Sequence, residues 1–217
     1  MCPGDAFACN DAYLAGGTHL PDIAVITPIF VDEQVRFFAA NLGHHADVGG
    51  PTPGSISHAA TSIFSEGIRI PPTRIVTGGQ VEDGVLRLIA HNTREPEERI
   101  LDLNVQVATN TRGAQQMQTL VKRLGRASVE VAVADLLAYT ARRMRVAIAK
   151  LKDGTNVHTS WMDHDGLGGG RVPITARVTV EGDTLRLSFD GTGSQSRGGY
   201  NVMPSGVLAT VAYAVKA

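Results

Sequence analysis

The sequence predicts an α+β fold in which antiparallel β-hairpins pack with two long amphipathic helices. Three features indicate this: alternating apolar segments near both ends, a middle stretch with few glycines and prolines, and no repeated strand–helix–strand pattern. A doubly wound parallel sheet needs such repeated units, so it is not expected. The chain has 217 residues, 43% of them hydrophobic, which suffices to bury a core in one domain or two small ones.

Two apolar segments near the N-terminus predict the first hairpin. IAVITPIF (23–30) and VRFFAANL (35–42) flank the short polar segment VDEQ, which suits a turn between antiparallel strands. Pro28 has no backbone N–H to donate, so the first strand is expected to be an edge strand or to carry a bulge. We assign residues 1–94 to a β-rich region whose loops are rich in glycine and histidine.

Residues 95–153 are expected to be helical. The segment 95–125 starts with acidic residues, as helices often do, and Gly113 marks a candidate break in it. From residue 128, apolar side chains recur at steps of three and four residues, which predicts a helix with one buried face. The residues of that face are Val129, Val133, Leu137, Met144, Ile148 and Leu151.

Residues 154–217 are expected to form a hairpin and a C-terminal helix. The segments 171–182 and 183–191 alternate apolar and polar residues around Gly182 and Asp183, which predicts two strands joined by a tight turn. VLATVAYAVKA (207–217) follows as a helix.

Charge and composition argue against several functional classes. Lys and Arg total 20 and Asp and Glu total 21, so no overall positive field attracts nucleic acid or an anionic membrane. No apolar run approaches the roughly 18 residues that a membrane span needs, and no signal-like segment opens the chain. We therefore expect a cytoplasmic protein. Cys2 and Cys9 show no spacing typical of a zinc site or a disulfide framework.

Two glycine-rich loops carry the candidate site. GTHLPD (17–22) precedes the first predicted strand, and LGHHADVGGPTPGS (42–55) follows the second. Because antiparallel neighbours place these loops at the same end of the hairpin, His19 and Asp22 should approach the polar residues 44–47. Two imidazoles and a carboxylate suit a divalent ion such as Mn, Fe or Zn. His and Asp also cap turns, so a purely structural role stays open.

The remaining polar motifs are weaker. Glu66, in SEGIRIPP (65–72), is either an acid behind the metal site or a surface residue. DHDG (163–166) lacks the ligand spacing of a calcium loop. GLGGGR (166–171) opens no helix, so a phosphate-binding loop is not expected there.

Four blocks of the sequence, in order, resemble the hydantoinase B family. They are GDAFACNDAYLAGGTHLPDIAVITPIF (4–30), FFAANLGHHADVGGPTPGSIS (37–57), SEGIRIPP (65–72) and FDGTGSQSRGGYN (189–201). The family includes subunits or domains of ATP-dependent hydantoinases, 5-oxoprolinase and the acetone and acetophenone carboxylases. The resemblance implies a metal-dependent catalytic component of an amidohydrolase that hydrolyses a cyclic amide of the hydantoin or 5-oxoproline class.

The resemblance also implies a partner, a cofactor and site residues. A hydantoinase A-type ATPase subunit would use ATP to phosphorylate the substrate oxygen, so the chain is expected to act in a hetero-oligomer. Matching to the acetone carboxylase motif places the metal ligands on His19, Asp22 and His44, with manganese favoured and zinc or iron as alternatives. The candidate catalytic residues, as proton carriers or partners of the ligating imidazoles, are Asp11, His45, Asp47 and Glu66.

Two alternatives stay open. The chain is either a carboxylase-type subunit acting on a ketone, or a non-catalytic truncated module that docks the ATPase partner. Family members are generally more than twice this length, so we expect a fragment that is incomplete at its C-terminus. Such a fragment is able to bind metal without turning over substrate.

Overall fold

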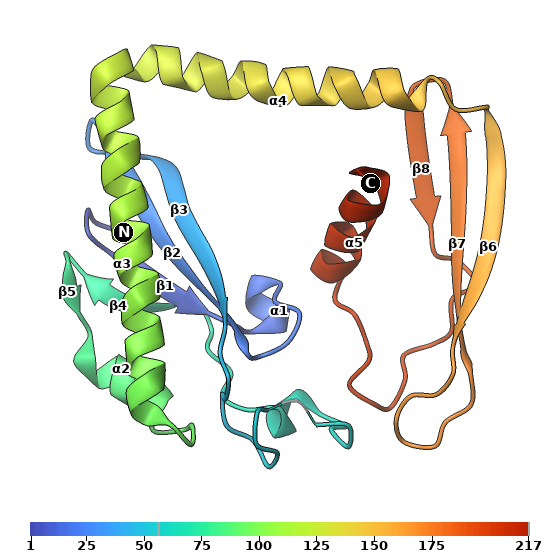
Figure 1. Ribbon diagram of the computed structural model, residues 1–217, viewed down its shortest axis with the longest axis horizontal. Coiled ribbons are helices and arrows are strands. Elements are labelled where there is room, and N and C mark those ends of the chain that lie inside the picture. Colours follow the sequence, from blue (N-terminus) through green and yellow to red (C-terminus); the bar gives the residue numbers. More distant parts are fainter. Residues whose placement is uncertain (56, 217) are drawn as a thin grey trace. The chain divides into compact units, whose positions relative to one another are not determined.

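The computed structural model describes residues 1–55 and 57–216, and it forms two compact units. The first comprises Met1–Arg123 and Asn201–Ala217, and the second comprises Leu124–Tyr200. Helices and antiparallel sheets make up both units (Figure 1), which confirms the predicted α+β class.

The first unit contains a five-stranded antiparallel sheet in the order β3-β2-β1-β4-β5. The predicted first hairpin is confirmed as β2 and β3, which pair from Asp22 opposite His44 to Val31 opposite Gln34. The two turn residues, Asp32 and Glu33, both have left-handed φ angles, of 51° and 61°, as a tight two-residue hairpin turn requires. The strands are β1 (Ala6–Cys9), β2 (Asp22–Val31), β3 (Gln34–His44), β4 (Thr73–Thr77) and β5 (Gln80–Val81).

Pro28 lies in an interior strand, so the edge-strand alternative is wrong. The pairing of β2 with β1 ends at Ile26 opposite Phe7, and Pro28 lies beyond that point. No N–H is therefore missing from the β1–β2 hydrogen bonds. The bulge alternative is also wrong for this strand: the β2–β3 register shifts where Ile29 pairs with Phe37 and Phe30 with Val35, so the extra residue, Arg36, lies on β3.

The long helix α3 (Pro96–Leu124) packs along β2 and β3 without a break. Asn110 donates to the carbonyl of Val25 (2.8 Å) and Gln118 to that of Phe30 (3.3 Å), on either side of Gly113. The break expected at Gly113 is therefore wrong, because packing against the sheet outweighs the roughly 1 kcal/mol helix penalty of one glycine. The smaller helices of this unit are α1 (Ala12–Ala15), η1 (Ile63–Ser65), α2 (Asp83–Ala90) and α5 (Pro204–Lys216).

The core of the first unit lies between the sheet and its helices. Residues within or next to the site loops belong to this core, since Leu20, Ile23 and Val48 are each at most 1% exposed. These buried side chains hold both loops against the core. The other members of the buried cluster are Ala6, Ala8, Val25, Ile70, Ile75, Val76, Leu86, Ile89 and Leu103.

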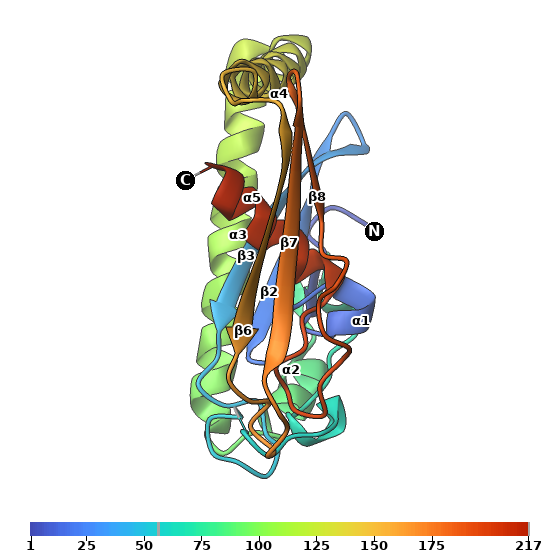
Figure 2. The same ribbon diagram turned by 90° about the vertical axis from the view of Figure 1, so that its right-hand side faces the viewer.

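The second unit contains α4 (Arg126–Ile148) and a three-stranded antiparallel sheet in the order β6-β7-β8, whose strands run side by side in Figure 2. The bounds are Gly154–Met162, Val172–Glu181 and Thr184–Ser188. The predicted hairpin around Gly182 is confirmed, since Glu181 pairs with Thr184.

The predicted buried face of α4 is confirmed only in part. Val129 is buried and Met144 and Ile148 are half-buried. Val133 and Leu137 are 42% and 67% exposed, and Leu151 lies beyond the end of the helix. The periodicity identified an apolar face, but periodicity does not show whether another element covers it.

The predicted C-terminal helix is confirmed as α5 for residues 207–216. Ala217 lies outside the described residues. Among the described helices, none is both long enough and apolar enough to cross a membrane.

Candidate metal centre

Strand pairing brings the three predicted ligands together. Asp22 is the first residue of β2 and His44 is the last of β3, and the two are direct partners across the hairpin. His19 joins them through a turn in which the backbone N–H of Asp22 donates to the carbonyl of His19 (3.2 Å). Leu20, fully buried within that turn, holds it against the core.

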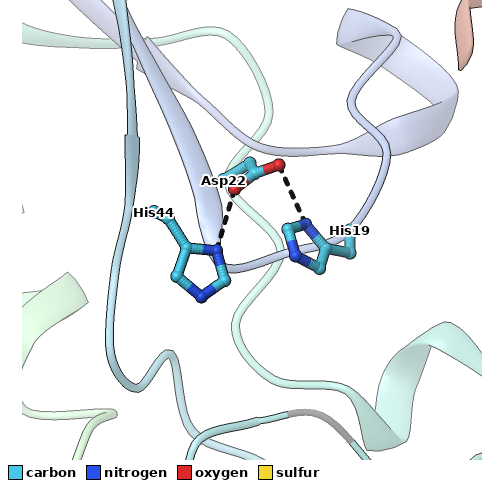
Figure 3. A group of neighbouring side chains, drawn as sticks. All are labelled: His19, Asp22 and His44. Atoms are coloured by element: carbon cyan, nitrogen blue, oxygen red, sulfur yellow. Dashed lines mark hydrogen bonds and ion pairs between the residues drawn. The ribbon is translucent and has the colours of Figure 1, made fainter.

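The carboxylate of Asp22 lies between the two imidazoles, as Figure 3 shows. Its Oδ1 is 3.0 Å from Nδ1 of His44, and its Oδ2 is 3.0 Å from Nδ1 of His19. The two rings lie with their centroids 5.1 Å apart. One ligand atom from each residue lies within 4.8 Å of the others, a spacing that one ion can bridge.

The cluster fits a divalent cation in its chemistry as well as its spacing. Nδ1 of His19 is buried and lies 3.0 Å from Oδ2 of Asp22. That contact does not have hydrogen-bond geometry, and among the described residues Nδ1 has no other hydrogen-bond partner. A nitrogen lone pair in that position is available to a metal. The side chain of Asp22 is 16% exposed and that of His44 is 54% exposed, so the cluster opens to solvent on the His44 side.

His45 lies in the interior, although it follows His44 directly. Its Nε2 is 3.0 Å from Oε1 of Gln106, and its backbone N–H donates to the carbonyl of Pro21 (2.8 Å). Burial lowers the pKa of His45, which favours the neutral ring. The structure therefore places this predicted catalytic residue behind the ligand cluster, against α3.

Asp47 anchors the loop that follows β3. Its carboxylate accepts the backbone N–H groups of Gly49 (2.9 Å) and Gly54 (3.1 Å) and binds the guanidinium of Arg94 (2.5 Å). Burial alone would raise the pKa of Asp47, but these hydrogen bonds outweigh it and hold the pKa below its usual value. The carboxylate is thus fully engaged in shaping its own loop.

Asp11 has a similar position at the start of α1. It caps the helix by accepting the N–H groups of Tyr13 (2.8 Å) and Leu14 (3.1 Å), and it binds Arg69 (2.7 Å). Burial acts to raise the pKa of Asp11, but Arg69 and the two N–H groups lower it on balance. The Arg69 guanidinium also lies over the ring of Phe64, 5.2 Å from its centroid.

Glu66 directly follows the short helix η1. Its side chain is half-buried at the end of η1. Burial raises the pKa of Glu66, and the charge of His19 acts in the opposite direction.

Sequence reasoning missed a set of buried polar residues on α3. Gln106 and Asn110 are 8% and 3% exposed and donate to the β2 carbonyls of Ile23 (2.9 Å) and Val25 (2.8 Å). The signal was present, because these amides follow Leu103 at steps of three and four residues, on the face turned to the core.

The family model described as hydantoinase B/oxoprolinase matches residues 1–217 of this chain. The chain belongs to the hydantoinase B/oxoprolinase family. The resemblance seen in the four sequence blocks is thereby confirmed. Members of the family include ATP-dependent cyclic amide hydrolases.

Curated relatives show which enzymes this hydantoinase B chain is similar to. It is 31% identical to 5-oxoprolinase 1 of Arabidopsis thaliana, over 98% of this chain and 18% of that protein. It is 32% identical to caprolactamase subunit beta of Pseudomonas jessenii, over 88% of this chain and 32% of that protein. The chain therefore spans about a third or less of these relatives.

The structural comparison agrees. The crystal structure of the ATP-dependent caprolactamase from Pseudomonas jessenii superimposes with a TM-score of 0.91 at 28% identity, over 98% of this chain and 36% of that chain. The nucleotide-free acetone carboxylase gives a TM-score of 0.87 over 99% of this chain and 30% of that chain, at 19% identity. The second match shows a shared fold.

Proposed function

We propose that this hydantoinase B chain is the metal-binding part of an ATP-dependent cyclic amide hydrolase of the hydantoin or 5-oxoproline class. The observation that carries the proposal is the convergence of His19, Asp22 and His44 at one end of the β2–β3 hairpin, in a chain of this family. Relatives named 5-oxoprolinase and caprolactamase support a cyclic amide as the substrate.

The ligand set would hold a divalent ion, with manganese favoured and zinc or iron as alternatives. Two imidazole nitrogens and a carboxylate oxygen match all three ions. A bound ion would act as a Lewis acid on the substrate carbonyl oxygen and on water. Thr18 donates to Oδ2 of Asp22 (3.2 Å) and so orients the carboxylate within the cluster.

Glu66 is our candidate proton carrier. Its side chain is half-buried and the charge of His19 acts against the rise that burial causes in its pKa, whereas the carboxylates of Asp11 and Asp47 are engaged by Arg69 and Arg94. A carboxyl in this position is able to take a proton from an attacking water or give one to the departing nitrogen. His45 lies in the interior and contacts Gln106 through its Nε2.

We propose that ATP is used by a hydantoinase A-type partner subunit, which phosphorylates the amide oxygen and makes the carbon attackable. The name of the relative caprolactamase subunit beta supports a multi-subunit enzyme. In the glycine-rich loop at 165–170, the carboxylate of Asp165 accepts the N–H groups of Leu167 and Gly169, both at 2.9 Å. Those N–H groups are satisfied by the chain itself and are not free for a nucleotide phosphate.

The test is reconstitution of the full-length polypeptide with its ATPase partner. Purified complex, treated with chelator and reloaded with Mn²⁺, is assayed with 5-oxoproline, hydantoin or caprolactam for substrate-dependent ADP release. The proposal predicts hydrolysis that needs ATP and returns with the metal. Carboxylation of a ketone with bicarbonate, in place of hydrolysis, would contradict it and favour the carboxylase alternative.

A second candidate function, docking without catalysis, is favoured by one observation. α4 exposes large apolar side chains, which soluble helices usually cover. They are Val131, Val133, Leu136, Leu137, Tyr139 and Val146. A folded chain that copurifies with the ATPase partner yet takes up no metal would support this candidate over the hydrolase.

A further inference from the structure

We propose that Gln106 is a positioning residue of the metal centre, one that sets the spacing between the strand ends carrying the ligands. The inference rests on the proposed metal site and deepens it. Gln106 lies on α3, far from the ligands in sequence, and is 8% exposed. None of the sequence motifs includes it.

A single amide contacts the residues that follow two of the three ligands. Its Nε2 donates to the carbonyl of Ile23 (2.9 Å), the residue after Asp22. Its Oε1 is 3.0 Å from Nε2 of His45, the residue after His44. Gln106 thereby connects the start of β2 and the end of β3 to the same point on α3.

The hydrogen-bond network fixes how this amide is oriented. Nε2 also donates to Oδ1 of Asn41 (2.8 Å), so both hydrogens of the amide meet acceptors. Oε1 must then face His45, and the ring nitrogen Nε2 of His45 must carry the hydrogen that it donates. The network defines one orientation of the amide and one tautomer of His45, so the contact has a single geometry.

Gly43, the residue before His44, allows this close approach. A Cβ built on Gly43 would lie 2.9 Å from Nε2 of Gln106 and 3.0 Å from its Cδ. A side chain at this position would push the amide away from the hairpin. The absence of a side chain at Gly43 therefore leaves room for the amide of Gln106.

These contacts determine ligand spacing because Asp22 and His44 end their strands. Strand ends fray unless they are tied down, and the two ligands are direct partners at that end. Outer residues that fix ligand geometry typically contribute about 10- to 100-fold in metal affinity. We expect Gln106 to act in this range without touching the ion.

Two other amides on the same helix provide comparisons, and the first is Asn110. It is a buried amide that donates to a β2 carbonyl at a similar distance, but its acceptor, Val25, lies two residues farther from Asp22 than Ile23 does. Gln118 does the same at Phe30, near the far end of β2. Replacing each amide by an apolar side chain of similar length removes a donor to a β2 carbonyl at increasing distance from the ligands. Asn110 also accepts from Asn41 (2.9 Å), which Gln106 contacts, so Gln118 is the stricter control.

The experiment measures Mn²⁺ affinity by titration calorimetry, and stability by urea unfolding, for wild type, Gln106→Met, Asn110→Leu and Gln118→Met. We expect Gln106→Met to weaken Mn²⁺ binding about 10- to 100-fold, Gln118→Met to leave it unchanged and Asn110→Leu to lie between the two, although all three variants lose stability. The Co²⁺-loaded Gln106→Met chain should also show a shifted visible absorption spectrum. Equal affinity for Gln106→Met and Gln118→Met would overturn the inference.

A second variant covers the case in which Gln106→Met does not fold. Gly43→Ala keeps every polar group and displaces the amide, so it should weaken Mn²⁺ binding in the same direction; wild-type affinity in a folded Gly43→Ala chain would overturn the inference. Wild-type protein that binds no metal would instead refute the proposed function itself. The two failures are thus distinguishable.

Discussion

Asp22 and His44 face each other as the terminal pair of the β2–β3 hairpin, with Oδ1 of Asp22 3.0 Å from Nδ1 of His44. The candidate ligands therefore inherit their spacing from a backbone register that is set by hydrogen bonds along both strands. A one-residue slip would move one of the two side chains to the other face of the sheet. The relative position of Asp22 and His44 is therefore fixed by the register of the hairpin.

Replacing the central carboxylate should abolish metal binding while the fold persists. Asp22→Asn keeps the size of the side chain but removes the charge that both imidazoles approach. We expect a loss of Mn²⁺ affinity larger than the roughly 10- to 100-fold typical of outer residues. Titration calorimetry checks this, with exposed Asp135→Asn as the charge-matched control; equal affinity in both variants would remove Asp22 from the ligand set.

Glu66→Gln should impair turnover and spare metal binding. General acid–base groups typically contribute about 10²- to 10⁴-fold in rate, so we expect kcat of the reconstituted complex to fall within that range. Exposed Glu95→Gln is the control. A Glu66→Gln enzyme with wild-type kcat would show that another group carries the proton.

Asp47 should contribute stability that disappears in acid. Its folded-state pKa is lowered, so its contribution is complete above the unfolded value of about 4. This stabilisation is lost as the pH falls from the unfolded-state pKa through the lower folded-state pKa of Asp47. We expect Asp47→Asn to lower the free energy of unfolding by about 2 kcal/mol at pH 7. The stability of this variant should also fall less in acid than that of wild type. Urea unfolding at pH 7, 5 and 3.5 measures both effects, and parallel curves for the two proteins would contradict the assignment.

Gly67, next to Glu66, should tolerate no side chain. Its φ of 137° is unfavourable for other residues, and a Cβ there would lie 2.4 Å from the carbonyl oxygen of Val48. We expect Gly67→Ala to destabilise the chain by about 3 kcal/mol, from backbone strain and steric overlap together. Gly78→Ala, also at positive φ but with open space around it, should cost about 1 kcal/mol. Equal melting temperatures for the two variants would contradict this reading.

The hairpin and the approach of its two end loops were predictable because both depend on local patterns. Alternating apolar residues located β2 and β3, and antiparallel geometry then placed residues 19–22 near residues 44–47, whereas the choice of His44 among these came from the resemblance to the acetone carboxylase motif. The different positions of His44 and His45 follow from the alternation of side chains along a strand, once the strand end is known.

Other features depend on contacts that spacing does not reveal. Gln106 meets Ile23 across 83 positions of sequence, and only the packing of α3 on the sheet shows this. The apolar face of α4 was visible as a pattern, but its exposure was not, because burial depends on which element covers a helix.

Elemental analysis of the purified chain, compared with His44→Ala and with His158→Ala, shows directly whether the three ligands hold a metal ion. The control histidine lies on β6 in the second unit. Circular dichroism of all three proteins confirms folding. The account predicts about one equivalent of Mn, Zn or Fe in wild type and His158→Ala, and loss of that metal in His44→Ala. A well-folded wild-type chain that stays free of metal after loading with Mn²⁺ would contradict it.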